Sequence, residues 1–456
     1  MWGAAAATAV ALLWVARTTV PLSCGVDGTF CKPHACARLR VHLDRRLHGQ
    51  AAAVDLLSDA VCDHVENPRP GKPLVASLHG SPGVGKSTFH RLLAQALYDA
   101  ADEDYGHLAA LDDREPNERS DPGDRRDDEA GGRRGWVDAA TGYASDALGG
   151  WSASWRGRRG PSDRDGVGRA ARRGKECPGR DCPGYKVIFG TDYVTSEQEA
   201  QGRMLRDAVL EHLRVFPEAV VVIEEYDKMG CPARGVLKQL LDKGAAANAT
   251  FHRAVFVLEA NVGFVQIHRR LQEAVTRATR RVGSEDGERK RDGIDADVTA
   301  MQRSLRDLMF ERWLSSACEE RSDTHKAVSA VDLFVPFFPL DRSAVAAVIE
   351  THLQDRAAHK TAPGGGELRA LTWRPGVVTW LVEQVEFERE FAIEGGKEAP
   401  AVLSRWVTRA IRVLAQERAS AGSAPGSGGS LKGARVEVDV SPERSELVAR
   451  VVDDDG

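Results

Sequence analysis

The sequence has no excess of positive charge. Its 456 residues include 62 Lys and Arg against 67 Asp and Glu, which gives a formal net charge of -5 and a pI near 6.3. Proteins that bind DNA or RNA through the phosphates usually carry a basic surface, so we expect no nucleic acid partner. With 42% hydrophobic residues, the chain is long enough to bury one large α/β core and a smaller domain.

A bilayer-length hydrophobic run is missing from the N-terminus. The apolar stretch Ala4 to Ala16 is too short to span a membrane comfortably, but its length is typical of a signal peptide. No Lys or Arg precedes it, and no Ala-x-Ala cleavage site stands out. We expect residues 1–37 to form a signal peptide or anchor followed by a cysteine-containing leader. A cleaved signal, an uncleaved anchor and a helical tail remain the three alternatives.

The eight cysteines lack the tight CxxC spacing of zinc sites. Cys24, Cys31 and Cys36 lie close together, and Cys177 and Cys182 bracket a short Pro/Gly loop. This usage favours an oxidising compartment, with a zinc site as the alternative, and the sequence does not reveal the pairing. The glycosylation sequon at Asn248 is usable only if its domain is luminal.

Residues 80–87 read GSPGVGKS, a complete GxxxxGK[ST] phosphate-binding loop. The apolar run Pro73 to His79 predicts a buried strand before the loop, and residues 88–100 show helical spacing after it. The expected nucleotide-binding residues are Gly80, Ser81, Pro82, Gly83, Val84, Gly85, Lys86, Ser87 and Thr88. The glycines let backbone N–H groups face the phosphates of ATP. The alternative is a glycine-rich structural turn.

Within this loop two side chains have predicted roles. We expect Lys86 to reach the β- and γ-phosphates and Ser87 to ligate Mg²⁺. Further along, the apolar strand Ala219 to Ile223 ends in Glu224 and Glu225, the Walker B arrangement. The first carboxylate would hold the metal and the second would polarise the attacking water. Glu224 stands where aspartate is usual; a solvated acidic strand end is the alternative for either residue.

Two further polar residues follow predicted core elements. Asn261 comes after the strand Ala254 to Leu258 and could hydrogen-bond the γ-phosphate or orient the water, as a sensor-1 residue does. Lys397 precedes the helical pattern Ala401 to Ala415 and is a candidate sensor-2 lysine. An ordinary turn asparagine and a surface lysine are the alternatives.

The remaining pattern predicts a large nucleotide-binding domain at 38–340, a small helical lid at 341–418 and a tail at 419–456. Residues 112–184 are rich in Gly, Arg, Asp and Ser and predict a disordered insertion, either a solvated loop or a binding module. The tail combines a Gly/Ser linker from Ala419 to Ser430 with a short β-hairpin. The other predicted elements are strands at 186–190, 334–340, 434–440 and 446–452, and helices at 209–215, 344–353 and 376–385.

These motifs together resemble torsin-type AAA+ ATPases of the Clp/HSP100 branch. LDRRLHGQ at 43–50, KPLVASLHGSPGVGKS at 72–87, EEYDKM at 224–229 and DLFVPFFPL at 332–340 carry the resemblance. It spans roughly residues 43–111 and 185–415. It implies an α/β fold, with a P-loop AAA+ parallel sheet flanked by helices and a small C-terminal helical lid.

The chain departs from the torsin pattern at three positions. Ser87 replaces the usual asparagine, Glu224 replaces the Walker B aspartate, and Gly396 replaces the cysteine of the Gly-Cys-Lys sensor-2 motif. The last change removes thiol-based redox sensing there, and Glu224 puts the hydrolysis rate in question. Like torsins, the chain has no arginine finger at the place used by Clp relatives, where it carries Ala330.

The resemblance implies an ATP- and Mg²⁺-dependent ATPase in the endoplasmic reticulum lumen or nuclear envelope. Hydrolysis would be weak alone and would depend on a membrane-bound, lamina-associated-polypeptide-like activator that supplies the arginine finger. It would be coupled to remodelling of a protein client or membrane complex by a homo-oligomer. One alternative is an ATP-binding scaffold with negligible hydrolysis. Another is a P-loop small-molecule kinase, although the predicted helical lid and the glutamate pair argue against it.

Overall fold

The computed structural model describes residues 24, 28–32, 34–98, 182–194, 198–246, 249–280, 289–315, 320–362, 368–421, 431–441, 443 and 446–452. Four predicted features lie outside these residues: the apolar stretch at 4–16, nearly all of the 112–184 insertion, the Asn248 sequon, and residues 422–430 of the linker. Within the described residues, no helix combines the length and apolar character needed to cross a bilayer.

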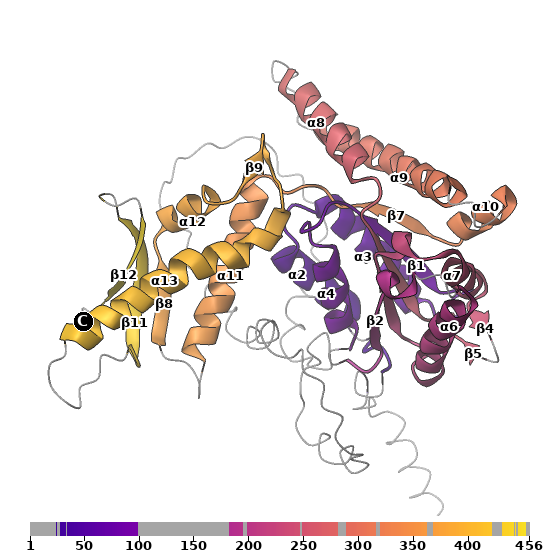
Figure 1. Cartoon of the computed structure of the whole chain (residues 1–456), viewed down its shortest axis with the longest axis horizontal. Helices are drawn as coiled ribbons and strands as arrows, with labels where there is room; N and C mark the ends of the chain where they lie inside the picture. Colours follow the sequence, from indigo (N-terminus) through magenta and orange to yellow (C-terminus); the bar gives the residue numbers. More distant parts are fainter. Residues whose placement is uncertain are drawn as a thin grey trace, which may run out of the picture.

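Five parallel strands form the central sheet, in the order β2-β3-β6-β1-β7 (Figure 1). They are β1 (Leu74–His79), β2 (Tyr185–Phe189), β3 (Val220–Glu224), β6 (Val255–Ala260) and β7 (Leu333–Pro336). The three central strands β1, β3 and β6 consist almost entirely of buried residues, as expected for a parallel sheet covered on both faces. Because the strands are parallel, their carboxyl ends meet at one edge of the sheet, where ligands of open α/β sheets bind.

Helices cover both faces of this sheet, because alternate strand residues point to opposite sides. Leu74, Ala76 and Leu78 pack into one core with α2 (Ala35–Arg46), α3 (Ala51–Glu66) and α4 (Lys86–Tyr98). Val75 points the other way and shares a second core with α6 (Gln198–Val215), α7 (Cys231–Lys243), α8 (Phe264–Arg280), α9 (Arg289–Ser315) and α10 (Arg321–Ser329). The short elements are β4 (Ala245–Ala246), β5 (Ala249–Thr250), η4 (Gly190–Tyr193) and η5 (Tyr226–Lys228).

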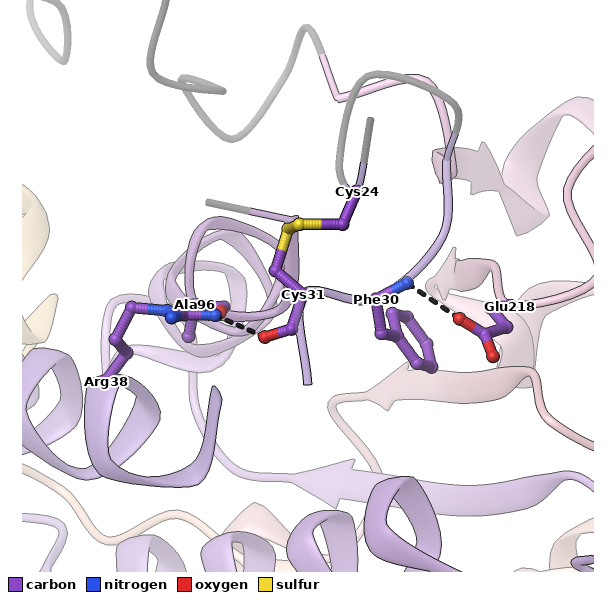
Figure 2. Close-up of a disulfide and its surroundings, with 6 residues drawn as sticks. All are labelled: Cys24, Phe30, Cys31, Arg38, Ala96 and Glu218. Carbon is purple, nitrogen blue, oxygen red and sulfur yellow. Dashed lines mark hydrogen bonds between the residues drawn. A yellow bond between two sulfur atoms is a disulfide. The ribbon is translucent and has the colours of Figure 1, made fainter. Parts of the chain in front are cut away.

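The segment before α2 is attached to the core by polar contacts and a disulfide (Figure 2). Cys24 is bonded to Cys31, and the fully buried Arg38 donates to the carbonyl oxygens of Cys31 at 2.6 Å and Ala96 at 3.0 Å. The backbone N–H of Phe30 donates to Glu218 Oε2 at 2.7 Å. Phe30 and Cys31 are buried in the core of α2 to α4, so the large domain includes residues that the sequence assigns to the leader.

A second disulfide joins Cys36 of α2 to Cys62 of α3. Cys182 and Cys231 are disulfide-bonded as well. Six of the eight cysteines are therefore in disulfides, which removes the zinc alternative for these six. The predicted use of cysteine in disulfides is confirmed for them.

The chain after β7 forms a separate core of helices and strands. Its helices are α11 (Arg342–Thr361), α12 (Pro375–Val382) and α13 (Glu398–Ala421), with η6 (Gly395–Lys397), β9 (Phe387–Glu388) and β10 (Phe391–Ala392) between the last two. The side chain of Asp341 caps α11 by accepting from Ala344 N at 2.8 Å. These elements lie beside the central sheet domain in Figure 1.

The sequence analysis predicts only helices for 341–418, and the structure differs. Strand β8 (Leu368–Trp373) pairs with β11 (Ala434–Ser441), which in turn pairs with β12 (Glu446–Val451). The C-terminal hairpin therefore exists, but it completes a three-stranded sheet against the helices instead of forming a tail. β8 escaped prediction because its buried residues are few and its alternation is short.

Three other elements begin or end at residues different from those predicted. Helix α13 continues to Ala421, so the predicted linker start at Ala419 is wrong. β7 ends at Pro336, earlier than the predicted Leu340, although Phe337 N still donates to His79 O of β1 at 2.7 Å. Helix α6 begins at Gln198, well before the predicted start, because its first turns are polar and give little apolar periodicity.

Candidate functional site

The phosphate loop, residues 80–85, connects β1 to α4 at the carboxyl edge of the sheet. Gly83 and Gly85 have left-handed φ angles of 79° and 105°, which residues with a side chain rarely adopt. A Cβ at Gly80 would lie 2.6 Å from the carbonyl oxygen of Phe337, so glycine is also needed there for space. The loop curls over the N-terminus of a helix, an arrangement that binds anions.

Some side chains of residues 80–88 are buried and others are exposed to solvent. Val84 is buried against the core, Thr88 lies in the first turn of α4, and Ser81 and Pro82 are partly or fully exposed. The predicted nucleotide-binding residues at 80–88 therefore run from the end of a buried strand through the loop into the first turn of α4. This matches the predicted strand-loop-helix unit.

Lys86 is the first residue of α4 and is almost fully buried, at 7% exposure. Its Nζ donates to the carbonyl oxygens of Gly80 at 2.8 Å and Ser81 at 2.9 Å and to Oδ1 of Asn261 at 3.1 Å. Burial lowers the pKa of Lys86 to about 8, and the nearby charge of Lys397 adds to this, while Glu259 opposes it. The ammonium group of Lys86 is thus held against the phosphate loop, where it is predicted to contact the β- and γ-phosphates.

The two predicted metal residues reach the same edge of the sheet. Ser87 Oγ donates to Glu259 Oε2 at 3.1 Å, and Glu259 shares the histidine His90 with Glu224. A hydroxyl and two carboxylates are the oxygen donors that Mg²⁺ prefers, so this donor set fits the ion implied by an ATP site. Glu224 lies at the end of β3 and is partly exposed.

Glu225 has a different environment. It adopts a left-handed φ of 54°, and its Oε1 accepts from Lys228 Nζ at 2.8 Å. Both side chains are substantially exposed, Glu225 at 38% and Lys228 at 46%. The structure therefore places the predicted base on the strand end beside the site, with its carboxylate paired to a neighbouring lysine.

The two candidate sensor residues reach the phosphate loop from different parts of the chain. Asn261 directly follows β6 and contacts Lys86 as described. Lys397 ends η6, where Gly396 N donates to Gly83 O at 2.8 Å. A Cβ on Gly83 would collide with the backbone oxygen of Glu394, so the sensor-2 segment packs directly on the phosphate loop. Both predicted sensors are thus brought to the loop from separate parts of the chain.

Sequence analysis missed two residues of this site, His90 and Glu259. His90 lies one helical turn after Ser87, and its Nε2 is 3.4 Å from Glu224 Oε1 and 3.0 Å from Glu259 Oε1. Burial lowers the pKa of His90, but hydrogen bonding and charge from the two glutamates outweigh it, so the pKa is raised overall. A signal for Glu259 was present, because a carboxylate within a fully buried strand is rare unless it is paired.

Comparison with known proteins bears on the first part of this site. Residues 26–109 match the family model described as Torsin. Torsin-3A of Rattus norvegicus is 45% identical over 53 residues, which are 12% of this chain and 13% of the relative. These matches support the torsin family. The matched region of this chain thus spans only about an eighth of the relative's length.

The torsin match covers α2, α3, β1, the phosphate loop and α4. Glu224, Glu225, Asn261 and Lys397 lie beyond it. The central parallel sheet flanked by helices fits the AAA+ fold of torsins. Of these residues, Asn261 contacts Lys86 and Lys397 lies against Gly83 of the phosphate loop, whereas the carboxylate of Glu225 is paired with Lys228.

Proposed function

We propose that this chain is a torsin-like AAA+ ATPase of the Clp/HSP100 branch that binds ATP with Mg²⁺ and hydrolyses it slowly. The observation that carries the proposal is the contact between Lys86 of the phosphate loop and Asn261 at the end of β6. It joins the nucleotide loop to a polar residue outside the torsin match, in the geometry expected for a γ-phosphate site. A glycine-rich structural turn would not need a buried lysine there.

Each site residue has a role that its position supports. Lys86 would exchange its carbonyl partners for phosphate oxygens, and the N-terminus of α4 would favour their negative charge. Ser87 and Glu224 would hold Mg²⁺, and the bound ion would neutralise part of the negative charge of the phosphates. Glu225 would orient the attacking water after turning away from Lys228, and Asn261 and Lys397 would contact the γ-phosphate.

The residue at position 330 supports the proposal that hydrolysis depends on an activator. Ala330 is the buried C-cap residue of α10, and its carbonyl oxygen accepts from Lys72 Nζ at 3.4 Å. The chain offers no guanidinium at this place, and an arginine supplied in trans can raise turnover by several orders of magnitude. We therefore propose that a membrane-bound activator supplies the arginine. The chain would act as a homo-oligomer, and it would remodel a protein client or a membrane complex.

The disulfides support a location in the endoplasmic reticulum lumen or nuclear envelope. Cys24–Cys31 and Cys36–Cys62 tie the start of the chain to the core. Disulfides of this structural kind persist in oxidising compartments and are rare in the cytosol. The torsin kinship of the same region points to the same lumen.

ATP binding tests the proposal directly. Titration of the full chain with a fluorescent ATP analogue and Mg²⁺ is expected to show saturable binding that Lys86→Ala abolishes. The control Lys326→Ala removes an exposed lysine of α10 and should bind like the parent. Equal binding by Lys86→Ala and the parent would mean that the phosphate loop is not the nucleotide site.

The alternative is an ATP-binding scaffold with negligible hydrolysis. Two features favour this alternative. His90 contacts the carboxylate of Glu224, the residue in the Walker B position. Glutamate also has one methylene more than the usual aspartate, which displaces the carboxylate from the position that aspartate would give it. Glu224→Asp discriminates between the two functions. A rise in turnover means that geometry limits a working ATPase, whereas tight binding with no turnover in either form means a scaffold.

A further inference from the structure

Three side chains with metal-ligating atoms meet beside the phosphate loop, and each comes from a different element. His90 lies on α4, Glu224 ends β3, and Glu259 lies near the end of β6. Their ligand atoms all lie within 4.8 Å of one another. We propose that His90 Nε2 and the carboxylates of Glu224 and Glu259 form a site for a zinc-class divalent transition-metal ion. The site goes beyond the proposed ATPase function, because binding requires no nucleotide.

The spacing suits tetrahedral coordination. Zinc bonds to histidine nitrogen and carboxylate oxygen are about 2.1 Å long, so ligand atoms at a tetrahedral centre are separated by about 3.4 Å. The Nε2 of His90 is 3.4 Å from Glu224 Oε1 and 3.0 Å from Glu259 Oε1. The three atoms could therefore bind one ion with small side-chain adjustments and leave a fourth position open.

Burial makes a shared partner for these atoms necessary. The side chain of His90 is 2% exposed and that of Glu259 is 7% exposed. His90 Nε2 and Glu259 Oε1 are in ion-pair contact, but neither makes a well-aligned hydrogen bond in the structure. The buried carboxylate of Glu259 and the partly exposed carboxylate of Glu224 both contact His90, and a divalent ion bound by all three would neutralise both negative charges.

The other ring nitrogen of His90 is already held as in known metal sites. Nδ1 lies 2.6 Å from the hydroxyl of Tyr185, a buried residue of β2. A hydrogen bond at the second nitrogen orients a ligating imidazole and fixes its tautomer. Tyr185 is therefore a positioning residue for the metal site.

The ligand set distinguishes this site from the Mg²⁺ site of the nucleotide. Mg²⁺ prefers six oxygen ligands, whereas an imidazole nitrogen favours zinc and its neighbours in the first transition row. Ser87 Oγ contacts Glu259 Oε2, so the two sites adjoin, and Glu224 belongs to both. The site lies at the carboxyl edge of the sheet, because Glu224 ends β3 and Glu259 lies near the end of β6.

Spectroscopic titration tests the proposal without nucleotide. The full chain is stripped with a chelator, dialysed and titrated with Co²⁺, which absorbs visible light strongly only in tetrahedral surroundings. We expect one tetrahedral Co²⁺ per chain, displaced by one equivalent of Zn²⁺. His90→Gln and Glu259→Gln should each weaken binding by at least tenfold.

Three further variants keep the outcome interpretable. Tyr185→Phe retains all three ligands and the ring packing, and it should weaken binding by about tenfold through loss of the hydrogen bond to His90. His212→Gln changes a histidine of α6 that contacts Gly184 and should bind like the parent. Lys86→Ala should lose ATP binding but still bind Co²⁺. ATP binding therefore reports on the nucleotide site and Co²⁺ binding on the metal site, so a failure of either proposal can be recognised separately.

Two results would overturn the site. One is the absence of stoichiometric Co²⁺ and Zn²⁺ binding by the folded parent chain, which would leave His90 as an ion-pair partner of two glutamates. The other is parental metal affinity in folded His90→Gln and Glu259→Gln, as judged by circular dichroism, which would place the metal elsewhere.

Discussion

Lys86 and Asn261 contact each other across the phosphate loop, with the lysine Nζ 3.1 Å from the amide oxygen of the asparagine. The lysine begins α4 and the asparagine follows β6, so the contact depends on the parallel arrangement of β1 and β6. The same lysine also binds two carbonyl oxygens of its own loop. The phosphate loop and the residue that follows β6 are therefore joined by a direct hydrogen bond.

Asn261→Ala is expected to lower ATP turnover by about tenfold or more while ATP binding changes little. The reason is that Lys86 keeps its loop partners, whereas the reacting phosphate or water loses a preorganised polar contact. Steady-state turnover and ATP titration measure the two effects. Asn67→Ala is the control, since Asn67 makes an exposed hydrogen bond to Arg69 N. A loss of binding that matches the loss of turnover would contradict the assigned role.

Glu225→Gln is expected to bind ATP like the parent and to hydrolyse it at least a hundredfold more slowly. Removing the carboxylate removes the group that polarises water, whereas the phosphate contacts stay. The exposed pair with Lys228 contributes little to stability, so the fold should be unaffected. Glu211→Gln in α6 serves as the matched control. Turnover at the parental rate in Glu225→Gln would show that another group acts as the base.

Acid should destabilise the fold through His42. Burial, aided by the charges of Arg38, Arg45 and Arg46, lowers the pKa of His42 to about 4 from its ordinary 6.5. The unfolded chain therefore binds more protons than the folded chain between these values, and stability is lost as the pH falls through this window. At pH 5 the loss from this residue is about 2 kcal/mol.

The comparison of His42→Gln with the parent checks this assignment. Urea unfolding at pH 7.5 and pH 5 should show a smaller drop in the free energy of unfolding for the variant. An identical drop in both proteins would mean that other groups account for the pH dependence, among them His79, whose pKa burial also lowers to about 4.

Replacing Cys36 and Cys62 by serine should lower the free energy of unfolding by about 3 kcal/mol, the loop-closure entropy expected for a loop of this length. The bond joins α2 to α3 with a sequence separation of 26. Urea unfolding of Cys36→Ser/Cys62→Ser against the parent measures the difference. No change in stability would mean that the helix packing holds this region without the bond.

The sequence was most informative where local pattern and chemistry coincide. The strand, loop and helix around Lys86 follow from an apolar run, required glycines and helical spacing, and Glu224 and Asn261 could be placed because each follows an apolar strand. Glu259 and His90 could not, because their partners come from three different elements. The pairing of β8 with the C-terminal hairpin could not be predicted either, because it joins residues distant in sequence.

The most direct test of the central claim is ATP turnover by the full chain, with its disulfides intact, because Phe30 belongs to the folded core and Cys36 is bonded to Cys62. It is measured alone, with the luminal domain of a lamina-associated-polypeptide-like activator, and in Lys86→Ala. We predict slow turnover alone, a sharp rise with the activator and none in Lys86→Ala. ATP binding with no turnover under either condition would contradict the ATPase and favour the scaffold.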